Sequence, residues 1–93
     1  MPSPPAQAEG TMNDSVNAKI AELRAEFLAS PENIRFDNAE RLLKAIRACI
    51  YGGWNLTAER ELAEAEWDAA EEAWSVAYRA YREAVIALRA TMK

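Results

Sequence analysis

A row of four carboxylates in the last third of the sequence comes nearest to a chemical site. Its members, spaced three and four residues apart, are Glu61, Glu64, Asp68 and Glu71. This spacing places them on one side of a helix, where carboxylate oxygens could hold Mg²⁺ or Ca²⁺ in a metal-dependent hydrolase. Such an enzyme would need a second acidic motif on another helix, and the preceding helix offers only Asp37 and Glu40. Charged rows on helices usually face solvent or form ion pairs, so we expect no metal site and no catalytic residue here.

The chain lacks the residues that several other common catalytic and metal sites require. The chain contains no histidine and one cysteine, which excludes Ser-His-Asp and Cys-His nucleophiles, the ordinary zinc and haem ligand sets and an internal disulfide. Cys49 lies on the apolar face of its predicted helix, and we expect it to be a small buried side chain. The sequence therefore predicts a non-enzymatic protein without a cofactor.

A seven-residue repeat between residues 56 and 92 is the strongest pattern in the chain. Large side chains recur at Trp67, Trp74, Tyr81 and Leu88, and small ones recur at Ala63, Ala70, Ala77 and Ala84. Two columns with this period lie on one face of a helix and are typical of a helix–helix seam. The repeat therefore predicts a long helix that packs against another helix along most of its length.

The rest of the sequence favours an all-α fold of three helices, two short and one long. Alanine is abundant, glycine and proline are scarce after residue 31, and β-branched residues do not cluster, so helix is favoured almost throughout. A chain of 93 residues forms one domain with a small core, and a partner chain would help to stabilise it.

Capping residues and breaks predict where these helices lie. The proline-containing residues 1–11 are expected to be a disordered tail, and residues 12–93 a single helical domain with helices at about 14–29, 38–51 and 57–91. Asp37 and Glu40 match a capping box, Gly52 and Gly53 suit a helix end with one glycine in the left-handed conformation, and Thr57 suits an N-cap. The broad apolar face of residues 39–50 indicates contact with more than one helix. The two short helices could run end to end along the long one, or form a compact bundle on its first half.

Charge along the long helix changes sign near Ser75. One flank of the seam carries the acids Glu61, Glu64, Asp68 and Glu71 and then the bases Arg79, Arg82 and Arg89. Such a flank is complementary to a second copy running in the opposite direction, and flanking charges set orientation in coiled coils. The pattern predicts an antiparallel homodimer through this helix.

A rival pairing lies within one chain. Residues 35–50 carry four bases and two acids, and a hairpin through Gly52 and Gly53 would lay them against the acidic half of the long helix. Both pairings can coexist in a dimer.

The predicted self-association or partner surface is the seam of the long helix. It comprises Trp67, Ala70, Trp74, Ala77, Tyr78, Tyr81, Val85 and Leu88. Tryptophan and tyrosine are enriched in binding hot spots, although at helical spacing they also form cores. A net charge of −4 and the lack of a concentrated basic face argue against direct nucleic-acid binding. No run of about 20 apolar residues is present, so we expect no membrane span and a cytoplasmic protein.

These observations favour a helical protein–protein interaction or regulatory module that self-associates through its long C-terminal helix. The alternative is an acidic inhibitor that mimics nucleic acid and occupies the channel of a basic partner protein, because acids crowd residues 59–72. The third hypothesis is the metal-dependent hydrolase considered above.

Overall fold

The chain folds into three helices, as predicted. The computed structural model describes residues 5–92, which form α1 (Pro5–Leu28), α2 (Pro31–Tyr51) and α3 (Thr57–Arg89), with no strand in this range. The all-α expectation is therefore confirmed.

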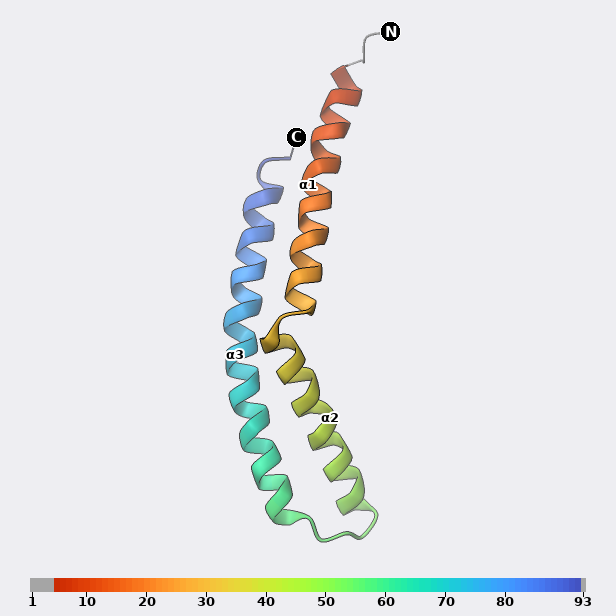
Figure 1. Ribbon diagram of the computed structural model, residues 1–93, viewed down its shortest axis with the longest axis vertical. Helices are drawn as coiled ribbons and strands as arrows, with labels where there is room; N and C mark the ends of the chain where they lie inside the picture. Colours follow the sequence, from red (N-terminus) through yellow and green to blue (C-terminus); the bar gives the residue numbers. More distant parts are fainter. Residues whose placement is uncertain (1–4, 93) are drawn as a thin grey trace.

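The helices form an extended hairpin. α1 and α2 follow one another end to end along one side of α3, and the molecule measures 72 × 23 × 16 Å (Figure 1). Of the two packings that the sequence left open, the structure adopts the collinear one. The lengths of α1, α2 and α3 are 24, 21 and 33 residues, so the first turns of α1 extend beyond the end of α3 (Figure 1).

The junction between α1 and α2 is only two residues long. Ser30 is the N-cap of α2, and its Oγ accepts a hydrogen bond from the Asn33 N–H at 3.2 Å while donating to the Phe27 carbonyl at 2.6 Å. Pro31 occupies the first turn of α2, where its missing N–H costs nothing and its fixed φ suits a helix. The same Ser-Pro pair therefore ends one helix and starts the next.

The structure corrects two expected helix starts. α2 begins at Pro31 rather than near residue 38, so the predicted capping box is wrong, and Asp37 instead pairs with Arg41 one turn later at 3.1 Å. α1 begins at Pro5 rather than near residue 14, because proline is tolerated in a first turn and the following alanines favour helix. The predicted tail thus falls partly on α1 and partly on residues 1–4, which lie outside the described residues.

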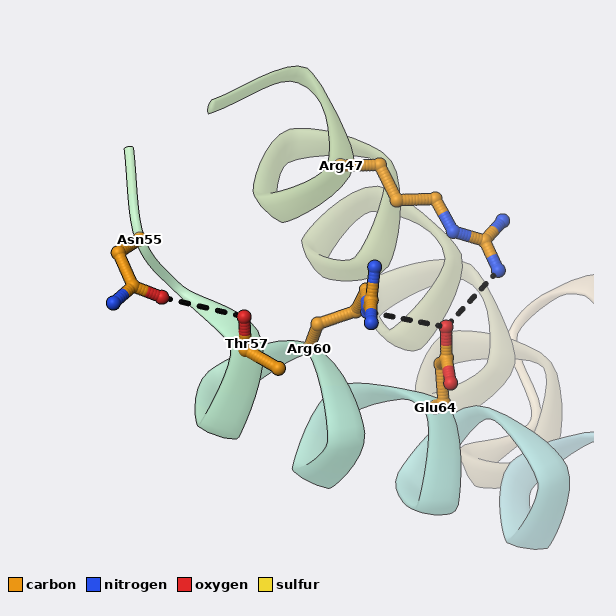
Figure 2. A network of polar contacts seen from close by, with 5 residues as sticks. All are labelled: Arg47, Asn55, Thr57, Arg60 and Glu64. Carbon is orange, nitrogen blue, oxygen red and sulfur yellow. Dashed lines mark hydrogen bonds and ion pairs between the residues drawn. The ribbon is translucent and has the colours of Figure 1, made fainter. Parts of the chain in front are cut away.

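The turn that closes the hairpin between α2 and α3 contains the two glycines, as predicted. Gly52 is the C-cap of α2, and Gly53 has a φ of 103°, a left-handed conformation that glycine adopts without strain from a Cβ. The expected cap at Thr57 is wrong. Leu56 occupies the N-cap position without a side-chain hydrogen bond, and the Thr57 hydroxyl donates to Asn55 Oδ1 at 3.3 Å (Figure 2).

The core is small and lies mainly between α2 and α3. The buried apolar residues are Ala39, Leu43, Ala63, Ala70 and Val85. The predicted second neighbour for the broad face of α2 is absent among the described residues, since α2 packs on α3 and meets α1 only near the junction. Leu42 is therefore 52% exposed, and Cys49 is exposed rather than buried as expected.

No helix within residues 5–92 has the length and apolar character needed to cross a membrane.

Candidate interaction surface

The predicted seam of α3 contacts another helix, but that helix belongs to the same chain. Ala70 and Val85 are buried, and Trp67, Trp74, Ala77, Tyr78, Tyr81 and Leu88 are half-buried. The seam therefore holds α1 and α2. That the same residues also meet a second copy stays a prediction.

Phe27 joins α1 to the aromatic column of α3. Its ring centroid lies 5.1 Å from that of Tyr81 in a stacked arrangement, and 5.9 and 5.7 Å from those of Trp74 and Tyr78 in edge arrangements. Both geometries are favourable for aromatic pairs. Ring contacts therefore join α1 to α3, whereas buried alanines line the packing of α2 on α3.

Trp74 connects α3 with both shorter helices at their junction. Its ring stacks on Phe36 of α2 at 5.3 Å and on Tyr78 at 4.8 Å, and its indole Nε1 donates a hydrogen bond to Asn33 Oδ1 at 3.0 Å. Phe36 also meets Trp67 at 5.6 Å. The sequence interpretation missed Phe36 because it placed residues 31–37 in a break. The signal was its spacing of three and seven residues from Ala39 and Leu43.

Two ion pairs between α2 and α3 confirm that the bases of α2 lie along the acidic half of α3. Arg35 contacts Glu66 through two hydrogen bonds of 2.8 and 2.7 Å. These hydrogen bonds, and to a smaller extent the guanidinium charge, hold the pKa of Glu66 below its ordinary value. Both side chains remain nearly half exposed, so the pair fixes orientation more than it stabilises the fold.

The second pair lies nearer the closed end, on the other side of the seam. Arg47 Nη2 is 3.5 Å from Glu64 Oε1, and Arg60 Nε approaches the same oxygen at 3.9 Å (Figure 2). Glu64 is thus shared by an arginine of α2 and one of α3. It is the one member of the predicted charged flank with ion-pair partners among the described residues.

The remaining six charged-flank residues have no ion pair in the described part of the chain. They are Glu61, Asp68, Glu71, Arg79, Arg82 and Arg89. All six side chains are exposed, and helical periodicity places them on the side of the seam that carries Glu64. These six residues thus present free acids on one half of α3 and free bases on the other, with the exposed Glu83 at the edge of the basic half.

The carboxylates of the row are not gathered around a common point. Among the side chains that the structure describes, within residues 13–92, no group of three or more Cys, Asp or Glu is arranged to hold a metal ion. Asp37, which belonged to the only other acidic pair considered, is engaged by Arg41. The row is instead a surface of separate exposed charges, apart from the half-buried Glu64.

The outer side of α3 leaves several apolar side chains uncovered. Leu62 is 73% exposed, Val76 66% and Ile86 58%. A shallow hollow on the charged flank is lined by Ser75, Tyr78, Arg82 and Ile86, among others. Together, exposed apolar groups and free charges of both signs make α3 the richest candidate interaction surface of the described chain.

Comparison of the chain with protein-family models, with curated proteins and with solved structures gives no significant match.

Proposed function

We propose that this chain is a non-enzymatic helical protein–protein interaction module that self-associates through α3. The single observation that carries the proposal is the thinness of the hairpin. Its five buried residues include no large side chain that is fully enclosed in the described part. A chain of this size gains little stability from so small a core, and a second layer of helices would add the missing burial.

The uncovered side of α3 supports a second copy as that layer. Ile86, 58% exposed, lies on the same flank of α3 as the unpaired charges and beside a hollow lined by Tyr78 and Arg82, and a second copy on that flank would remove its apolar surface from water. A contact along most of a helix about 50 Å long approaches the roughly 800 Å² per partner of a standard interface. The exposed thiol of Cys49 suits a reducing compartment, and we place the proposed activity in the cytoplasm.

Sedimentation equilibrium over a range of concentrations tests this function. We expect a species of about twice the monomer mass of 10.4 kDa, with a dissociation constant in the micromolar range or below. Arg82→Glu on α3 should weaken the dimer. Arg24→Glu changes the net charge by the same amount on α1 and should not. A monomer at every concentration would overturn the proposal.

A nucleic-acid mimic remains the second candidate because most carboxylates of residues 59–72 are free. Glu59, Glu61, Asp68, Glu71 and Glu72 have no ion pair among the described residues. The test is binding to a lysine-rich DNA-binding protein. A mimic should compete with duplex DNA and lose affinity steeply with salt, whereas a self-associating module should do neither.

A further inference from the structure

We infer that two copies of this chain pair through the charged flank of α3, antiparallel, on a two-fold axis at Ser75. The inference rests on the proposed function and adds to it the surface, the direction and the register of the contact.

The free charges are placed symmetrically about Ser75. Glu71 and Arg79 lie four residues on either side of it, Asp68 and Arg82 lie seven, and Glu61 and Arg89 lie fourteen. In an antiparallel pair of identical helices, residues equally far from the two-fold axis face one another across the contact. Each free acid of one copy therefore faces a free base of the other.

The one acid of this flank that is paired within the chain fits the same register. Glu64 lies eleven residues before Ser75, and Ile86 lies eleven residues after Ser75. Glu64 already has Arg47 and Arg60 as partners and needs no base opposite it. Ile86, 58% exposed, would instead lie over the apolar parts of these side chains and contribute burial to the contact.

The neighbouring face of α2 does not cancel this pattern. Its charged residues on this side are Asp37, Glu40, Arg41, Lys44 and Arg47, which line a hollow beside Trp67. Asp37 pairs with Arg41 and Arg47 pairs with Glu64, which leaves Glu40 and Lys44 to offset one another. In the half of the flank that borders α2, the net charge that a partner meets is thus set by α3.

Ser75 itself suits the position on the axis. It is exposed and small, and it lies at the centre of the charged flank, so two copies of α3 can approach closely at this point. Complementary charges mainly set the orientation and rate of association, while Ile86 and the hollow lined by Tyr78 and Arg82 would contribute packing.

Cysteine cross-linking tests the register directly. In a Cys49→Ala background, Ser75→Cys brings two thiols together across the axis, since a disulfide needs Cα atoms within about 7 Å. Ala80→Cys, also exposed on α3 but on the opposite flank, is the matched control. We expect mild oxidation to join Ser75→Cys chains into a covalent dimer at least about tenfold faster than Ala80→Cys chains; equal rates would overturn the register.

A charge exchange tests the pairing independently. Arg82→Glu or Asp68→Arg alone should raise the dimer dissociation constant roughly tenfold, because each change breaks two symmetry-related pairs. The two changes in one chain should restore it, since the pair is re-formed with signs reversed. Circular dichroism confirms that each variant is folded.

The outcomes separate the two proposals. If the unmodified chain dimerises but neither the cross-link nor the exchange behaves as expected, this register is wrong and self-association stands. If the chain is a monomer at all concentrations, both fall.

Discussion

Along α2, the long helix is held by small buried side chains, whereas along α1 it is held by aromatic rings that remain half exposed. In the α2 half, Ala63 and Ala70 of α3 are 2% and 0% exposed, and Ala39 and Leu43 of α2 are 5% and 6% exposed. In the α1 half, Val85 is the only buried residue among those whose side chains are described (residues 13–92), and Phe27 of α1 makes three ring contacts with α3. The α2 half is thus packed through small side chains that leave little space between the helices. The α1 half depends on a few large aromatic side chains, each of which contributes much of the contact.

The largest effect should follow from removing the ring that holds α1. Phe27→Ala should lower the free energy of unfolding by about 3 kcal/mol, since it deletes three aromatic contacts and much apolar area. Phe27→Leu, which keeps much of the volume, should cost about 1 kcal/mol. Chemical denaturation measures both values. Amide exchange should show protection lost in α1 and kept in α2; equal loss in both would contradict the division into two halves.

An intermediate effect should follow from enlarging an alanine of the seam. Ala70→Leu should destabilise the protein by about 2 kcal/mol, because a fully buried position has no room for three more carbons. Ala84→Leu makes the same change in the α1 half, where the position is only half-buried, and should cost less than about 1 kcal/mol. Thermal or urea unfolding compares the two variants. A larger cost at Ala84 would reverse the proposed order of packing density.

The smallest effect should come from the ion pair of Arg35 and Glu66. Because the pKa of Glu66 is lowered from its ordinary 4.5, its contribution to stability is present above that pH and is lost as the pH falls through the lowered pKa. Glu66→Gln should therefore flatten the dependence of stability on pH in this acidic range. Arg35→Gln should flatten it to the same degree. Urea midpoints measured across this range provide the test, and an unchanged slope would show that the pair does not couple to folding.

The part of the fold that was predictable from sequence is the long helix α3, whose residue pattern repeats. The alternation of Trp67, Trp74 and Tyr81 with Ala63 and Ala70 extends over several heptads, and such a long periodic signal has few alternative explanations. The hairpin pairing of α2 with the acidic half of α3 also followed from charge and from the two glycines.

Single local signals were harder to interpret. Ser30 and Pro31 are compatible with a helix end, a short turn or a helix start. In the structure they cap and open α2, and the contacts of Phe36 and Asn33 with Trp74 hold its first turns against α3. Cys49 was misplaced because an apolar face shows what can be buried but not whether a neighbour is present to bury it. The charged flank was predicted as a set, yet which of its members are free depends on the reach of Arg47 and Arg60 toward Glu64.

Trp74 also gives the molecule an intrinsic optical probe. Its indole bridges the junction of α1 and α2 through Phe27, Phe36 and Asn33, while Trp54 is 70% exposed at the closed end. If the junction bent away from α3, water would reach Trp74 and also Trp67, whose ring meets Phe36 at 5.6 Å, and the emission of both would shift to longer wavelength, while that of Trp54 would stay almost constant. The native chain can therefore report the straightness of its own hinge without an added label.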